Sequence, residues 1–183
     1  MFGCNLCVPG LVIVTRFPYY SAMNSSIIPH DWRCSAAETP FGMLYLATQQ
    51  ERLVRASFHP FSEHFYDRNQ AWYDAINTGV LPAPIAPTGT DFQLAVWPCL
   101  QQTPLGETRS YQQIADQLGR PNSVRAVANA IAANPIAWFI PCHRVIRSTG
   151  ELGGYAWGIE KKRQLLAYER QLAARLPTNM AVT

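Results

Sequence analysis

The sequence predicts an α+β fold in which a small strand-containing N-terminal part precedes a mostly helical C-terminal part. Residues 43–47 and 53–58 form two short runs of strand-forming residues around a polar stretch, which predicts two strands joined by a turn. Ala71–Asn77 could form a short helix that closes near Gly79. Three prolines within residues 82–87 exclude a helix and predict a stiff linker, which marks the domain boundary.

The predicted domain organisation has four parts in 183 residues. Residues 1–37 show no sustained apolar period and are expected to form an irregular N-terminal extension. Residues 38–87 are expected to hold the sheet-containing domain, and residues 88–176 the second domain. Residues 177–183 are expected to form a tail.

The charge of the chain is uneven. Residues 1–90 carry five Arg against six acidic residues, whereas residues 91–183 carry ten basic against six acidic residues. A basic second half suits a polyanionic partner, although many metabolic enzymes share this balance. The longest apolar run at the N-terminus, Leu11–Val14, is far too short to span a membrane, and no signal-peptide pattern is visible. We therefore expect a cytoplasmic protein, or a nuclear one in a eukaryote, without a membrane partner.

The five cysteines are an odd number, which argues against a closed disulfide framework and leaves room for a free thiol. Cys4, Cys7, His30 and Cys34 could together make a zinc site of three cysteines and a histidine. Their long spacing and irregular setting favour incidental cysteines instead, so the sequence assigns no metal site.

The second domain is expected to open with a helix. Thr90 can cap a helix that begins at Asp91, and Pro98 inside the pattern predicts a bend. The residues expected on its buried face are Phe92, Val96 and Leu100.

Two further helices predict a helix-turn-helix. Ser110 and Gln113 have the spacing of a capping box, and the turn falls at Gly119-Arg120-Pro121. The second helix starts near Asn122 or Ser123 and ends at Asn134-Pro135; its expected buried face is Val124, Val127, Ala128 and Ile131. Such a pair is moderate evidence for DNA binding, and a plain helical hairpin is the alternative.

The outward face of the second helix is expected to carry Ala126, Asn129, Ala130 and Ala133, with Arg125 on the flank. A helix that reads sequence presents several Arg, Asn or Gln side chains to base edges, whereas this face is mostly methyl groups. It is therefore typical of a helix that approaches nucleic acid closely without reading sequence. The alternative is a helix packed against protein on both faces.

Cys142 is the candidate nucleophile. The apolar run Ile136–Ile140 predicts a buried strand that ends at Pro141, and Cys142 follows directly beside His143 and Arg144. These neighbours could stabilise a thiolate. Consecutive side chains of an extended chain point to opposite sides, so His143 would reach Cys142 only through a bend or a bridging water. The alternative is that Cys142 is a small buried hydrophobic residue.

The last predicted helix, Ile159 to about Leu176, places a carboxylate on its apolar stripe. Glu169 lies one turn from Leu165 and Leu166, and burying a carboxylate is unfavourable unless it is paired. His143 is the natural partner among the four histidines, which would complete a relay of nucleophile, base and orienting acid. An exposed Glu169 at the end of an amphipathic helix is the alternative.

The chain resembles the O6-alkylguanine-DNA alkyltransferase family over roughly residues 90–172, and only loosely over residues 39–89. The resemblance is carried by Pro141-Cys142-His143-Arg144-Val145 and, in the family's order and spacing, by Ser110-Tyr111-Gln112-Gln113, Val124-Arg125-Ala126-Val127, Asn134-Pro135, Gly154-Tyr155 and Gly158. It implies an N-terminal domain with a small antiparallel sheet, packed on a mostly helical C-terminal domain.

The resemblance also implies residue roles. Arg125 resembles the finger that fills the gap left by an extruded guanine, and Tyr111 the residue that helps to rotate the nucleotide and hydrogen-bonds the base. Asn134 resembles the residue that ties the helix-turn-helix to the active-site segment. His143 and Glu169 match the positions that draw the proton from Cys142 through a water. The implied substrate pocket is Tyr111, Val145, Tyr155 and Ala156.

The activity implied is direct repair of DNA. The second helix enters the minor groove of double-stranded DNA, O6-alkylguanine flips out, and its alkyl group moves irreversibly to Cys142. O4-alkylthymine is a further expected substrate. The protein is expected to act as a monomer, once per molecule, without a metal or organic cofactor.

Three other interpretations are weighed against this one. A relative that only binds alkylguanine in DNA has another residue in place of the cysteine, whereas this chain has Cys142. A helix-turn-helix transcription regulator is disfavoured by the alanine-rich outer face and by the lack of a second DNA-binding module. A cysteine hydrolase is disfavoured by the match over residues 90–172.

Overall fold

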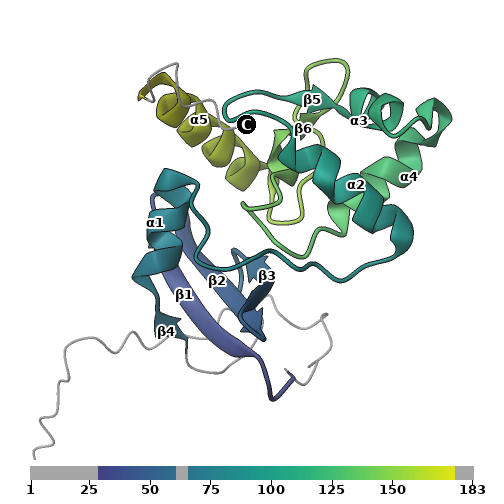
Figure 1. Ribbon diagram of the computed structural model, residues 1–183. Coiled ribbons are helices and arrows are strands. Elements are labelled where there is room, and N and C mark those ends of the chain that lie inside the picture. The colour runs from purple at the N-terminus through teal and green to yellow at the C-terminus, as the bar shows by residue number, and fades with distance from the viewer. Residues whose placement is uncertain (1–28, 61–65, 176–183) are drawn as a thin grey trace, which may run out of the picture.

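The computed structural model describes residues 29–60 and 66–175. Its N-terminal part is a four-stranded sheet of order β3-β2-β1-β4, and its C-terminal part is mostly helical (Figure 1). The strands are β1 (Arg33–Thr39), β2 (Gly42–Gln49), β3 (Arg52–Ser57) and β4 (Asp67–Arg68). β1, β2 and β3 pair antiparallel, and the short β4 joins β1 in parallel. The α+β prediction is confirmed.

The hairpin between β2 and β3 matches the two predicted strands. Gln50 and Glu51 at its tip both have positive φ, 49° and 60°, which a tight two-residue turn between twisted strands requires. Helix α1 (Gln70–Thr78) packs on β1 and ends at Gly79, whose φ of 75° is the left-handed conformation that closes helices. The helix predicted over Ala71–Asn77 is confirmed.

The irregular extension predicted for residues 1–37 is wrong from Arg33 onward, because Arg33–Ala37 belong to β1. The strand sequence RCSAAET is small and polar, so it gives little strand signal by itself. It is held instead by neighbours on both edges, β2 and β4. Cys4 and Cys7 lie outside the described residues. Within residues 29–60 and 66–175, no group of three or more His, Cys, Asp or Glu is placed to hold a metal ion.

The proline-rich linker runs along the free edge of β3. Leu53 donates its N–H to Pro84 O (2.8 Å) and accepts from Ala86 N (2.8 Å). On the same strand, Ala56 donates to Pro135 O (3.0 Å) and accepts from Ala137 N (2.9 Å). β3 therefore holds both the linker and the segment that leads to Cys142.

The C-terminal part consists of α2 (Asp91–Gln101), α3 (Tyr111–Gln117), α4 (Val124–Ala132), α5 (Ile159–Arg175) and short elements between them. The short elements are β5 (Arg109–Ser110), β6 (Val145–Ile146) and the 3-10 helices η1 (Pro121–Ser123) and η2 (Cys142–Arg144). Thr90 caps α2 and Ser110 caps α3, each within a capping box, as the sequence predicts for Ser110.

Helix α2 continues through Pro98, and the bend expected there stays a prediction. It continues to Gln101 with Val96 and Leu100 fully buried, while Pro98 lies on the exposed side. No helix among the described residues is both long and apolar enough to cross a membrane.

Candidate active site

The segment before Cys142 is a compact turn, so the strand predicted for Ile136–Ile140 is wrong. Ile140 N donates to Ile136 O (3.1 Å) and Phe139 N to Ala137 O (2.9 Å) across Trp138, whose φ is 69°. This is a γ-turn with positive φ, a rare and strained conformation. The apolar residues of this run are buried except for the partly exposed Phe139, so their composition resembles that of a buried strand although the backbone forms turns.

Cys142 and His143 sit in the 3-10 helix η2 and are both buried. Pro141 before them has φ −80° and ψ 61°, and Cys142 N donates to Ile140 O (2.8 Å), which makes an inverse γ-turn. The strand-like alternation of side chains assumed from the sequence therefore does not apply here, since a 3-10 helix has three residues per turn.

Asn134, just after the second helix of the helix-turn-helix, holds the sulfur of Cys142. Its amide Nδ2 donates to Ile140 O (2.8 Å) and to Cys142 Sγ (3.0 Å), with a longer contact to Ile136 O (3.3 Å). Its Oδ1 accepts from Ile136 N (3.0 Å). One buried side chain thus links α4, the turn and the sulfur.

Glu169 of α5 is fully buried and lies against His143, the partner that the sequence predicts. His143 Nε2 is 2.7 Å from Glu169 Oε1, and both side chains have no exposed area. Arg144 adds three contacts to the same carboxylate, from Nε to both oxygens (3.0 Å each) and from Nη2 to Oε1 (2.8 Å). The Nη1 of Arg144 donates to Thr103 O (2.5 Å). The buried carboxylate of Glu169 therefore has hydrogen-bond partners on both His143 and Arg144.

The protonation states follow from these contacts. Burial acts to raise the pKa of the Glu169 carboxyl, but the hydrogen bonds and charges of His143 and Arg144 outweigh it and hold that pKa below its ordinary 4.5. Burial lowers the pKa of His143 below 6.5, so its ring is neutral at pH 7. Since ionised Glu169 can only accept, Nε2 carries the proton and Nδ1 is left as an acceptor. Among the described residues, Nδ1 has no hydrogen-bond partner.

Burial also raises the pKa of the Cys142 thiol above its ordinary 9.0, although the Asn134 hydrogen bond and the charge of Lys162 act to lower it. In the free protein the thiol is therefore protonated at pH 7. A thiolate stabilised by its neighbours, as expected from the sequence, is not the resting state. The site pairs a neutral thiol with a neutral imidazole.

Lys162 is a site residue that the sequence reasoning missed. It is fully buried on α5, and its Nζ donates to Val145 O (2.5 Å) and, at the limit of hydrogen bonding, to Gly154 O (3.5 Å). Burial lowers its pKa to about 8. The signal was available, because Lys162 stands one turn before Leu165 and Leu166 on the stripe that also carries Glu169.

The four predicted pocket residues differ in their burial. The hydroxyl of Tyr155 is buried near Cys142 without the geometry of a hydrogen bond, and burial together with Cys142 raises its pKa well above 10. Tyr111 is half-buried, and burial followed by Cys142 raises its pKa as well. Val145 is buried, whereas Ala156 is exposed. Cys142 thus raises the pKa of two phenols.

The second helix of the helix-turn-helix, α4, presents most of the predicted outer face. Arg125, Ala126, Asn129 and Ala133 are exposed or partly exposed. Ala130 is not: only 4% of it is exposed, and its carbonyl accepts a hydrogen bond from Trp97 Nε1 (2.9 Å). The prediction for Ala130 is wrong because α2 packs along α4 and widens its buried face.

The comparisons with known proteins agree with this geometry. The family model described as "6-O-methylguanine DNA methyltransferase, DNA binding domain" matches residues 91–171. A methylated-DNA–protein-cysteine methyltransferase of Mycolicibacterium paratuberculosis is 38% identical over 148 residues, which cover 73% of this chain and 90% of the relative. The chain belongs to the methylated-DNA–protein-cysteine methyltransferase family. The resemblance found in the sequence is confirmed.

Solved structures of the family share the fold. A crystal structure of Mycobacterium tuberculosis OGT in complex with DNA has 36% identity and a TM-score of 0.66, covering 76% of this chain and 93% of that one.

The regulatory protein ada of Salmonella typhimurium is 42% identical over 156 residues, or 77% of this chain and 44% of that protein. The chain thus spans only about half, or less, of several curated relatives that it matches.

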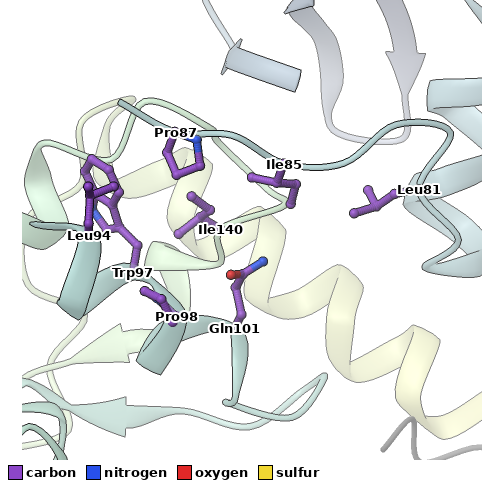
Figure 2. Close-up of a pocket in the computed structure, with 8 residues that line it drawn as sticks. All are labelled: Leu81, Ile85, Pro87, Leu94, Trp97, Pro98, Gln101 and Ile140. Atoms are coloured by element: carbon purple, nitrogen blue, oxygen red, sulfur yellow. The ribbon is translucent and has the colours of Figure 1, made fainter. Parts of the chain in front are cut away.

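Cys142 is not among the residues that line the hollow drawn in Figure 2. The hollow has a volume of about 400 Å³ and lies between the linker and α2, where Ile85, Trp97 and Ile140 contribute to its wall (Figure 2). Gln101 is its most polar lining residue. Its lining holds no cysteine and no titratable side chain.

Proposed function

We propose that the protein repairs DNA by moving an alkyl group from O6 of guanine to Cys142, once per molecule. The observation that carries this proposal is the buried array of Cys142, His143 and Glu169, in which Asn134 fixes the sulfur and Glu169 fixes the imidazole. O4-alkylthymine is proposed as a second substrate because it presents the same alkylated oxygen beside a ring nitrogen.

The proposed transfer is a displacement at the alkyl carbon. Cys142 sulfur forms the new C–S bond, the C–O6 bond breaks, and its electron pair stays with guanine. The thiol proton passes to Nδ1 of neutral His143 through a bridging water, and a proton returns to the guanine anion, with Tyr111 donating to the leaving base. The product thioether has no hydrolytic exit, so the protein is consumed. This chemistry calls for no metal or organic cofactor.

The proposed DNA surface is the exposed face of α4. Ala126, Asn129 and Ala133 would lie in the minor groove, where small side chains allow close approach without sequence readout. Arg125 would enter the base stack in place of the flipped nucleotide, and Tyr111, Val145, Tyr155 and Ala156 would line its pocket. The similar Mycobacterium tuberculosis OGT was crystallised in complex with DNA, which supports a DNA partner here as well.

The test is a single-turnover incubation with a duplex that contains O6-methylguanine, followed by mass spectrometry of the cysteine peptides. We expect one methyl group, on the Cys142 peptide, and repaired guanine that never exceeds one equivalent of protein. Cys142→Ser should abolish transfer, whereas Cys99→Ser, at another buried free cysteine, should retain it. Transfer by Cys142→Ser, or an unmodified Cys142 in the native protein, would overturn the proposal.

A further inference from the structure

Trp138 lies against the imidazole of His143 in a stacked arrangement. The two rings are nearly parallel, with an interplanar angle of 8° and centroids 5.5 Å apart. Trp138 also stacks on Phe41, from the turn between β1 and β2, with centroids 4.8 Å apart and an angle of 29°. All three side chains are buried. A continuous stack thus joins the N-terminal sheet to the base of the cysteine site.

The backbone conformation of Trp138 is unfavourable for a residue with a side chain. Its φ of 69° is in the left-handed region, where a side chain costs about 1–2 kcal/mol and glycine nothing. Such strain persists where surrounding contacts over-determine the conformation, and it gathers at functional sites. The turn alone would be served better by glycine. The indole is therefore present for what it contacts.

Beside a more distant T-shaped contact with Tyr155, whose ring centroid is 6.5 Å away, the contacts of His143 leave a tilt of its ring that the indole can fix. Rotation of an imidazole about its Cβ–Cγ bond has broad, roughly two-fold preferences, so nothing intrinsic sets the ring plane. The hydrogen bond from Nε2 to Glu169 selects one edge of the ring but allows it to tilt about that contact. A flat surface parallel to the ring removes the tilt. The direction of Nδ1, the acceptor atom, then becomes defined.

We propose that Trp138 is a positioning residue for His143: stacked on Phe41, its indole sets the imidazole plane so that Nδ1 faces the path of the Cys142 proton. The inference rests on the proposed alkyl transfer and names a further residue of that site. It also gives the N-terminal sheet a role in the chemistry, because Phe41 supports the indole. Trp138 touches neither the sulfur nor the substrate in this role.

The test compares Trp138→Leu, which removes the aromatic face, with Trp138→Phe, which keeps one. Trp72→Leu is the matched control, since Trp72 is a buried tryptophan of α1 that contacts Phe139 in the same turn and is separate from the His143 stack. Methyl transfer from an O6-methylguanine duplex is followed in single turnover over a range of DNA concentrations. We expect Trp138→Leu to lower the rate at saturating DNA by roughly tenfold or more, the scale of a misplaced proton acceptor.

The half-saturating DNA concentration should stay within about twofold of the native value, because Trp138 is buried away from the α4 surface. Trp138→Phe should recover most of the rate, and Trp72→Leu should behave as the native protein. A Trp138→Leu rate within about twofold of native would overturn the proposal. So would a Trp72→Leu variant as slow as Trp138→Leu, or no recovery in Trp138→Phe.

A second measurement does not depend on transfer or on the leucine variant folding. In ¹⁵N-histidine protein without DNA, assigned with His143→Asn, the ring nitrogens of His143 should report one tautomer, protonated at Nε2. The ring protons of His143 should be shifted upfield by the indole face, and Trp138→Phe should keep the single tautomer. Unshifted protons or mixed tautomers in the native protein would overturn the positioning role. Absent methyl transfer with these signals intact would overturn the proposed function alone.

Discussion

Glu169→Gln tests whether the buried carboxylate holds the site together as the structure indicates. The substitution keeps the shape of the side chain and removes its charge. It also turns an amide NH₂ toward Arg144, which presents only donors, so at least one of the present contacts becomes a donor facing a donor. His143 keeps an acceptor only if the amide oxygen faces it.

The expected magnitude follows from burial. Neutralising one partner of a fully buried ion pair costs about 3–5 kcal/mol, and the side chain of Glu169 has no exposed area to reduce this by solvation. Since Arg144 retains some exposure, we expect the lower end, about 3 kcal/mol, out of the roughly 5–15 kcal/mol that stabilise a domain. In urea unfolding followed by circular dichroism, the midpoint should fall by about 1–3 M.

The matched control is Glu160→Gln on the same helix. Glu160 pairs with Arg163, but its side chain is 66% exposed, so its loss should change stability by no more than about 0.5 kcal/mol. The reasoning would be refuted if Glu169→Gln lost less than about 1 kcal/mol at neutral pH, or if the two variants were equally destabilised.

The same variant carries a pH signature with a definite sign. The pKa of folded Glu169 is below its ordinary 4.5, because His143 and Arg144 outweigh the effect of burial. The stabilisation is therefore complete above about pH 4.5 and is lost as the pH falls through the folded value. The difference between native protein and Glu169→Gln should shrink in acid. A difference that stays constant until both proteins unfold would contradict the assignment.

Three shorter predictions concern the rest of the site. Asn134→Ala leaves Ile136 N without a hydrogen-bond partner and leaves Ile140 O only the bond from Cys142 N, so it should destabilise the fold by about 2–4 kcal/mol in urea; a loss below about 1 kcal/mol would exclude its linking role. Arg125→Ala should slow transfer from an O6-methylguanine duplex far more than reaction with free O6-benzylguanine, and equal slowing would argue against base replacement. The rate of Cys142 modification by iodoacetamide should still be rising at pH 9.0, because burial raises the pKa of the thiol above that value. A plateau below about pH 8 would show a low-pKa thiol instead.

The elements that could be predicted from the sequence are those whose signal is local. Capping at Ser110 and Gln113, closure of α1 at Gly79 and the prolines of the linker all act within a few residues. The pairing of Glu169 with His143 was predictable for a different reason. A charge on an apolar stripe demands a partner wherever the chain brings one, and only one histidine stood near the candidate nucleophile.

The parts that could not be predicted depend on distant neighbours. β1 has small and polar residues and becomes a strand through pairing with β2 and β4. Ala130 is buried by Trp97, which is 33 positions earlier in the chain. The turn around Trp138 could not be predicted because its φ is positive, and a bulky residue is rarely found in that conformation. Lys162 shared the signal of Glu169, on the same stripe of the same helix, and was overlooked.

The protonation states of Cys142 and His143 bear on when the buried thiol can react. A thiol whose pKa is raised by burial reacts slowly with small electrophiles at neutral pH, which would protect a residue that the proposed reaction uses only once. The neighbouring imidazole is neutral because burial lowers its pKa, so in the proposed transfer it would take the proton once an alkyl carbon is in line with the sulfur. In the proposed transfer, Glu169 stabilises the imidazolium against the opposing charge of Arg144, and the charge of Lys162 stabilises the developing thiolate. In the proposed mechanism, reactivity therefore depends on a substrate that fills the pocket and not on a thiolate in the free protein.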